Sequence, residues 1–254
     1  MSLSLLSWNV NSLRVRLPLV LRVLDEHEPD IVCLQETRIA DAAFPRAAFE
    51  ERGYVVASAC SSGYAGVAIA SREPIEDTIV GIAGFVEAKA PGRRLACRIG
   101  GRWIDTVYVP TRTAIGKVAF LDALRDDYAT RLRDASLVLA GDFNICLDAR
   151  DYASPSMISS PDVHPGRPED LAFRGVLAHG LHDCFRERHD EGGHFSWFPL
   201  TPWAMKRNYG MRLDYVFASR DLASSVVDVV HDREPRSWPR PSDHLPLRAE
   251  FDVA

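Results

Sequence analysis

Short apolar runs recur along the 254-residue chain, and each is followed by a polar residue, a glycine or a proline. The runs are rich in Leu, Val and Ile, which is typical of strands buried in a core. We therefore expect a strand at each run. They occupy residues 3–8, 31–34, 54–57, 66–70, 103–109, 137–140, 213–218 and 225–230.

Helical periodicity separates several of these runs. Two stretches place apolar residues three and four positions apart, which predicts amphipathic helices. The first stripe is Leu13, Leu17, Val20, Leu21 and Leu24, and the second is Val118, Leu121, Leu124, Tyr128 and Leu132. Strands and helices are interspersed over the whole length, so the fold class is α/β or mixed α+β.

The chain shows no linker, charge block or low-complexity tract that would divide it. We therefore predict a single domain over residues 1–254. The longest irregular stretch, residues 148–170, carries four prolines and is expected to form a surface loop. Loops of this length are often functional.

Charge and hydropathy narrow the class of protein. No apolar run approaches the roughly 18–20 residues of a membrane-spanning helix, and the opening MSLSLLSWN predicts a first strand instead of a signal peptide. The net charge of −5 argues against a surface coated with phosphate-binding side chains. It is compatible with a nucleic-acid enzyme, because an acidic metal site lowers the net charge while a local basic rim still contacts phosphates.

The cysteines number five and lie far apart in the sequence, with no pair at metal-ligand spacing. We expect reduced core thiols in a cytoplasmic protein.

Several predicted strands end in polar residues that a core strand does not need. If these strand ends meet, they gather three carboxylates, several amides and one imidazole. Oxygen-rich sites of this kind suit Mg²⁺, or Mn²⁺ in its place. The residues concerned are Asn9, Asn11, Gln35, Glu36, Tyr108, Asp142, Asn144, Asp243 and His244.

Each of these residues alone has an ordinary structural explanation. Glu36 is compatible with a solvated turn, GDFN with a turn, and Asp243-His244 with a cap of a helix or strand. Their occurrence together, in order and at strand ends, favours a functional site.

Six segments that contain these residues resemble the exonuclease III branch of the endonuclease/exonuclease/phosphatase superfamily. They are SWNVNSLRVRL, PDIVCLQETRI, VYVP, GDFN, GMRLDYVFAS and PSDHLPL, and they run from residue 7 to residue 247. NSLR, FSW and MRLDY resemble the abasic-site endonucleases more narrowly. The resemblance implies a four-layer α/β sandwich, in which two packed β-sheets are flanked by helices. The chain departs from relatives at Ser12, in the short TRTAIGK segment, in the loop 145–170 and at Met211.

The resemblance also implies roles for the strand-end residues. Glu36 and Asp243 would hold the main metal ion, and the wider set of candidate ligands is Asn9, Glu36, Asp142, Asn144, Asp243 and His244. Asp142 would orient and deprotonate a water, and Asn144 would donate to a phosphoryl oxygen. His244, held by Asp214, would contact the phosphate together with the Tyr108 hydroxyl.

Basic and aromatic residues near the C-terminal half are candidates for DNA contacts. The segment 201–212 contains no acidic residue and would position phosphates. The family resemblance implies that FSW places Trp197 against a flipped abasic sugar. A solvated surface would equally explain the basic residues, and core packing would equally explain Trp197. The candidates are Arg112, Trp197, Lys206, Arg207, Met211 and Arg212.

These features predict a Mg²⁺-dependent DNA repair nuclease acting as a monomer. It would cut 5′ to abasic sites in double-stranded DNA and trim or clean blocked 3′ ends. Two alternatives stay open: a phosphodiesterase or phosphatase of the same fold that acts on RNA or a small molecule, and a binding module with an inactive site. The number of metal ions and the balance of endonuclease and exonuclease activity are open as well.

Overall fold

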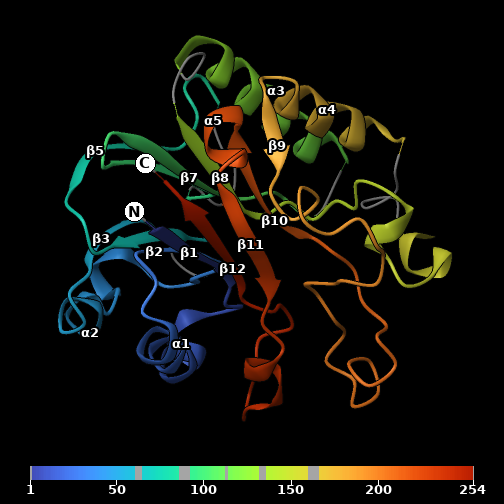
Figure 1. The fold of residues 1–254 in the computed structure, drawn as a ribbon, viewed down its shortest axis with the longest axis horizontal. Helices are drawn as coiled ribbons and strands as arrows, with labels where there is room; N and C mark the ends of the chain where they lie inside the picture. Colours follow the sequence, from blue (N-terminus) through green and yellow to red (C-terminus); the bar gives the residue numbers. More distant parts are fainter. Residues whose placement is uncertain are drawn as a thin grey trace.

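Two six-stranded β-sheets form the centre of the computed structural model, which describes residues 2–60, 65–85, 92–111, 114–131, 136–159 and 166–253 (Figure 1). The first sheet has the spatial order β11 (Val226–His231), β12 (Leu247–Asp252), β1 (Ser2–Asn9), β2 (Ile31–Gln35), β4 (Val67–Ser71) and β3 (Val55–Ala59). The second has the order β5 (Ile75–Val80), β6 (Arg94–Ile99), β7 (Arg102–Tyr108), β8 (Leu137–Asp142), β10 (Asp214–Ser219) and β9 (Leu181–Asp183).

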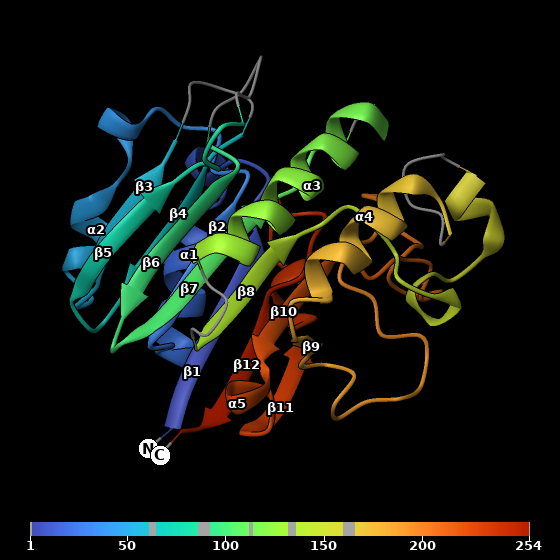
Figure 2. The same ribbon diagram turned by 90° about the horizontal axis from the view of Figure 1, so that it is seen from above.

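Helices cover the outer faces of both sheets, so that four layers result (Figure 2). The first sheet packs against α1 (Leu13–His27) and α2 (Arg46–Glu50), and the second against α3 (Ala114–Arg131) and α4 (Pro168–Leu177). A short helix, α5 (Arg220–Ala223), follows β10. Four 3₁₀ turns cover Asp41–Ala43, Ala149–Asp151, Pro155–Ser159 and Glu234–Ser237. The predicted four-layer sandwich is confirmed.

Burial on both faces explains why the central strands β2, β4 and β8 are buried at every position, whereas β12 near the edge alternates buried and more exposed residues. In β1, Leu3 and Leu5 enter the core between the sheets, whereas Leu6 and Trp8 enter the core beneath α1 and α2. A strand covered on one face only would carry polar residues at half of these positions. The eight apolar runs all overlap observed strands.

None of the eight apolar runs or the two helical stripes covers β5, β6, β9, β12, α2, α4 or α5. The apolar part of β6 is short, because the strand begins at the buried Arg94, which pairs with Asp105 and Asp127 in the interior, and contains the exposed Arg98. The prediction of an irregular loop over residues 148–170 is partly wrong, since this stretch contains two 3₁₀ turns and the start of α4 at Pro168. Leu132, at the end of the second predicted stripe, lies outside the described residues.

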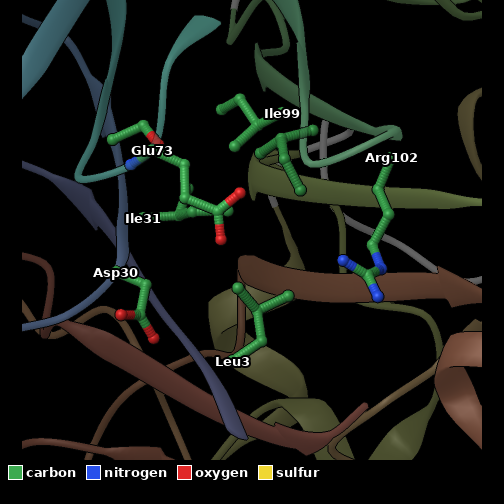
Figure 3. A pocket seen from close by; sticks show the side chains of 8 residues that line it. Leu3, Asp30, Ile31, Glu73, Ile99 and Arg102 are labelled. Carbon is green, nitrogen blue, oxygen red and sulfur yellow. The ribbon is translucent and has the colours of Figure 1, made fainter. Parts of the chain in front are cut away.

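The end of the sandwich where β1 and β2 begin offers no room for a ligand. Leu3, Ile31, Ile99 and Ile104 close a cavity of about 10 Å³ there, with Arg102 nearby (Figure 3). That volume accommodates about one water molecule. The polar strand ends lie at the opposite end, where β1 and β2 terminate.

All five cysteines are free thiols, as the sequence predicted. Within the described part of the chain, no helix combines the length and the apolar character required to cross a membrane.

Candidate active site

Strand pairing brings the polar strand ends to one edge of the sandwich. β1 and β2 are parallel, with Asn9 opposite Gln35, so Glu36 follows beside Asn9. In the second sheet, β7 and β8 are parallel with Tyr108 opposite Asp142. The antiparallel β10 adds Asp214 opposite Asp142. Because parallel strands end at the same edge, residues far apart in sequence meet there.

Gly141 allows the close approach of strands at this edge. A Cβ atom at this position would lie 2.1 Å from the carbonyl oxygen of Val107, which is closer than any real contact. The glycine of GDFN is therefore required by packing between β7 and β8, and it places Asp142 at the strand end.

Asn9 connects the two sheets through its side-chain amide. The group is fully buried and donates to Glu36 Oε1 at 2.9 Å and to Asp142 Oδ2 at 2.8 Å. One neutral amide thus holds two carboxylates side by side. Such a pair of neighbouring negative charges favours a cation between them.

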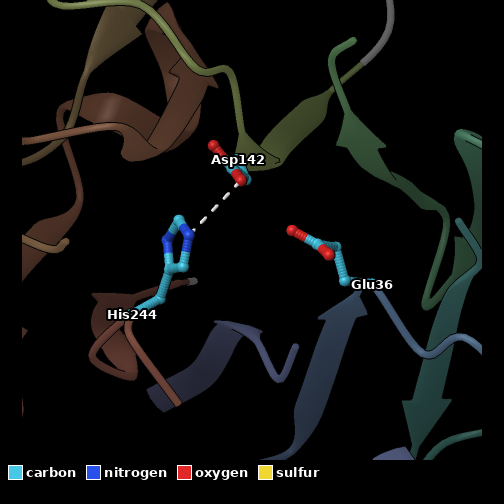
Figure 4. Close-up of side chains that lie close together, drawn as sticks. All are labelled: Glu36, Asp142 and His244. Carbon is cyan, nitrogen blue, oxygen red and sulfur yellow. Dashed lines mark ion pairs between the residues drawn. The ribbon is translucent and has the colours of Figure 1, made fainter. Parts of the chain in front are cut away.

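Glu36, Asp142 and His244 converge at the centre of the site, with one ligand atom of each inside a group no more than 4.8 Å across (Figure 4). They adjoin a cleft of about 280 Å³. Residues lining the cleft are Glu36, Thr111, Lys117, Asn144, Met157, Trp197, Met211, Leu213, Asp243 and His244.

Asp142 is wholly buried, and burial raises the pKa of its carboxyl group to about 7. The nearby His244 opposes this shift, whereas the negative charges of Asp214 and Glu36 add to it. A carboxyl group with a pKa near neutrality can both take and release a proton. Asp142 therefore has the properties of a general base.

His244 lies between two carboxylates. Its Nδ1 is 2.8 Å from Asp214 Oδ2, and its Nε2 is 3.7 Å from Asp142 Oδ2. Burial alone would lower the pKa of the imidazole, but Asp214 and Asp142 raise it well above its ordinary value. His244 faces the centre of the site through Nε2, a position compatible with both roles that the sequence suggested, a metal ligand and a phosphate contact.

Asp243 lies in the cleft but outside the group of three. Its Oδ1 accepts a hydrogen bond from Asn11 at 2.8 Å, and its Oδ2 accepts one from Trp197 Nε1 at 3.0 Å. Burial would raise the pKa of Asp243, yet His244 and these hydrogen bonds hold it below the usual range. The carboxylate is thus ionised and orients the Trp197 ring.

Asn144 lies in a turn beyond the end of β8. β8 ends at Asp142, and Asn144 adopts a left-handed backbone with φ of 52°. Its backbone N–H donates to Asp142 Oδ1, and its side-chain amide donates to the carbonyl of Val109. Lys117, fully buried on α3, donates to the Asn144 carbonyl at 2.8 Å. A turn after β8, and not a continuation of the strand, thus places Asn144 at the cleft.

Tyr108 ends β7 with its ring buried. Burial and the charges of Glu36 and Asp142 raise the pKa of its hydroxyl well above the ordinary value, although Arg93 lies 4.7 Å from the ring centre. The hydroxyl therefore stays protonated and acts as a hydrogen-bond donor.

The predicted DNA contacts divide into two groups. Trp197 and Met211 line the cleft, and Lys206 and Arg207 are exposed on the loop before β10. Arg212 faces inward instead, which corrects the prediction that it contacts DNA. Arg112 lies outside the described residues.

Arg212 is 1% exposed, and its guanidinium pairs with two carboxylates. Its Nε is 2.8 Å from Asp151 Oδ1, and its second terminal nitrogen is 2.8 Å from Asp183. Arg186 also donates to Asp151 at 2.7 Å. This network anchors the loop after β8 beneath Met211.

Arg38 and Met157 are two of the site residues that escaped the sequence prediction. Arg38 pairs with the second oxygen of Glu36, and Met157 lines the cleft from the irregular stretch after β8. Arg38 directly follows the QET motif, so its proximity to Glu36 could have been inferred. Met157 carries no sequence signal, because its position depends on how the loop folds.

Comparisons with known proteins agree with this geometry. The model of the endonuclease/exonuclease/phosphatase family matches residues 6–244. The chain is 27% identical to exodeoxyribonuclease III of Haemophilus influenzae, over 97% of this chain and 98% of that protein. An AP endonuclease structure from Archaeoglobus fulgidus shares 33% identity and a TM-score of 0.92, over 99% of this chain and 100% of that one.

A 3′ phosphatase from Neisseria, solved with a product DNA hairpin, shares 32% identity and a TM-score of 0.93, over 99% of this chain and 100% of that one. The family match, the shared fold and the converging strand ends lead to one conclusion. The chain belongs to the endonuclease/exonuclease/phosphatase family.

Proposed function

We propose that this protein is a DNA repair nuclease that hydrolyses the phosphodiester 5′ to abasic sites and removes blocking groups or nucleotides from 3′ ends. The observation that carries the proposal is the convergence of Glu36, Asp142 and His244 beside a cleft with an apolar wall. The relatives named as exodeoxyribonuclease III and AP endonuclease support it. Residues 1–254 would act as one catalytic domain, because both sheets contribute to the same cleft.

The donor set fits a divalent cation. Glu36 and Asp142 present carboxylate oxygens around the amide of Asn9, and the cluster contains no thiolate. Hard cations such as Mg²⁺, or Mn²⁺ in its place, prefer oxygen ligands. When bound, Mg²⁺ would neutralise charge on the phosphoryl group.

The protein's own residues would carry out the proton transfer and hold the phosphate. Asp142 would accept a proton from the attacking water, because its carboxylate is buried at the centre of the site beside His244. The His244 imidazolium, held by Asp214, would donate to a phosphoryl oxygen. Tyr108 would add a second hydrogen bond from its protonated hydroxyl.

An apolar wall on the cleft fits a sugar that has lost its base. Trp197, Met211, Leu213 and Met157 supply this wall. Flipping costs least where no base is stacked, so a small apolar pocket selects an abasic site. The exposed Lys206 and Arg207 would contact phosphates of the flanking duplex.

The test is a cleavage assay on four substrates with and without Mg²⁺: an abasic duplex, a duplex with a 3′ phosphate, a recessed 3′ end, and a small phosphodiester. We expect Mg²⁺-dependent cleavage of the DNA substrates, and its loss in Asp142→Asn, which removes the base at nearly constant volume. Hydrolysis of the small phosphodiester alone would refute the DNA proposal and favour the small-molecule alternative. Activity of Asp142→Asn within about tenfold of wild type would refute the role of Asp142.

A further inference from the structure

Lys117 is a buried cation at the edge of the cleft, and the proposed reaction assigns it no role. Its side chain is 1% exposed, and it is one of the residues that line the cleft. Lysine is almost never buried to this extent unless its ammonium group is paired. The residue type is also rare in this chain, since lysine and arginine together number 30 and only three of them are lysine. In so arginine-rich a chain, a buried lysine indicates a position that requires a compact ammonium group instead of a planar guanidinium.

The position of Lys117 on α3 is electrostatically unfavourable for the helix. α3 begins at Ala114, so Lys117 lies in its first turn, which contains no acidic residue. The backbone N–H groups at the start of a helix carry a partial positive charge, which disfavours a cation nearby. Helix stability therefore gives no reason for a lysine here, and the reason lies in what the ammonium group contacts.

That contact is the backbone of Asn144, in the turn that follows β8. Lys117 Nζ donates to the Asn144 carbonyl at 2.8 Å in a buried hydrogen bond. Asn144 has the left-handed φ of 52°, which few residues other than glycine adopt. Its N–H donates to Asp142 Oδ1 at 2.9 Å, and its side-chain amide donates to the Val109 carbonyl at 3.1 Å. The bond from Lys117 is thus one of three that hold Asn144 in this conformation beside the cleft.

We propose that Lys117 is a positioning residue for phosphodiester hydrolysis and acts through Asn144. The amide nitrogen of Asn144 carries two hydrogens, so it can donate to a phosphoryl oxygen while it keeps its bond to Val109. Such a donor is most effective when it is held in place before the charge develops. Lys117 fixes the backbone that carries this donor, because hydrogen bonds from an ionised group are stronger than neutral ones. The inference rests on the proposed function, in which Asn144 contacts the phosphoryl group.

A direct contact between Lys117 and the phosphate is the competing explanation. Both roles predict slower cleavage when the lysine is replaced, but only the positioning role depends on Asn144. If Lys117 acts through Asn144, it becomes dispensable once the Asn144 side chain is removed. If Lys117 binds the phosphate itself, its loss costs the same in either background. Residues that act through one another give non-additive effects, which a double-mutant cycle measures.

The test is a double-mutant cycle of Lys117→Met and Asn144→Gly, with kcat and KM measured in saturating Mg²⁺ on a DNA substrate that the wild-type protein cleaves. Methionine keeps most of the aliphatic chain, and glycine adopts the left-handed backbone without strain. Lys117→Met should lower kcat about ten- to a hundredfold with KM nearly unchanged, because a displaced donor weakens a contact made in the transition state. Asn144→Gly should lower kcat about a hundred- to a thousandfold. The double variant should be no slower than Asn144→Gly.

Two outcomes would overturn the role of Lys117: wild-type kcat in Lys117→Met, or an equal loss of kcat in the wild-type and Asn144→Gly backgrounds. Lys117→Gln, whose side chain is one bond shorter, takes the place of Lys117→Met if the latter does not fold. Arg98→Met is the control and should keep kcat and KM, since it removes an exposed cation of β6 that pairs with Glu76. A wild-type protein that cleaves none of the DNA substrates refutes the proposed function itself, so the two failures are distinguishable.

Discussion

Replacing Arg212 with alanine distinguishes two explanations of a basic residue beside the cleft. The sequence suggested a DNA contact, whereas in the structure the guanidinium is buried and pairs with Asp151 and Asp183. The buried pairing predicts a loss of stability. A DNA contact predicts a loss of affinity with stability unchanged.

The expected magnitude follows from what the substitution leaves behind. Breaking a buried ion pair by removing one partner costs about 3–5 kcal/mol. Asp151 keeps its hydrogen bond from Arg186, and Asp183 is partly exposed at 14%, so the lower end of that range applies. For a chain of this size, about 3 kcal/mol lowers the melting temperature by roughly 6–12 °C.

The assay combines thermal unfolding with duplex binding at several salt concentrations. Lys206→Ala is the matched control, because Lys206 is exposed on the same loop. It should keep the melting temperature and flatten the salt dependence of binding by about one unit of slope. Arg212→Ala should lower the melting temperature and leave the salt dependence of binding unchanged. A stable Arg212→Ala protein with a flattened salt dependence would refute the buried-pair explanation and restore Arg212 to the DNA contacts.

Substitutions at three further residues test the site. Glu36→Gln should reduce cleavage by orders of magnitude and raise the Mg²⁺ concentration required, because a neutral amide replaces a charged ligand. If the wild-type protein keeps its full activity in EDTA, the reaction does not require a metal ion. Asp214→Asn should lower kcat at least about a hundredfold, since it removes the carboxylate that holds His244. Near-normal turnover by the folded variant would contradict this role of Asp214. Trp197→Ala should reduce the preference for abasic over intact duplex, whereas Trp197→Phe, which loses only the hydrogen bond to Asp243, should keep it. A wild-type preference for abasic duplex in folded Trp197→Ala would refute the role of the aromatic wall. Melting temperatures must accompany both variants, because the partly buried Trp197 also packs against Met211 and Leu213.

The sequence by itself determined the kinds of element and the chemical groups at their ends. Apolar runs such as 137–140 are strands because they are buried on both faces, and that burial follows from composition and length. Polar residues directly after such runs, including Glu36 and Asp142, stood out because a core strand does not need them. The motifs that contain them also sufficed to predict the family and the layered fold.

Only the tertiary structure decided how these groups interact. Asn9 reaches Asp142 across 133 positions of sequence, and Asp214 meets His244 across 30, so neither contact has a local signal. Arg212 is basic in any sequence context, yet whether it faces DNA or the interior depends on Asp151 arriving from another loop. Asn144 reaches the cleft through a left-handed turn that strand periodicity does not anticipate. Sequence periodicity reports which residues a strand or helix buries, whereas pairing between distant side chains depends on the packing of the whole chain.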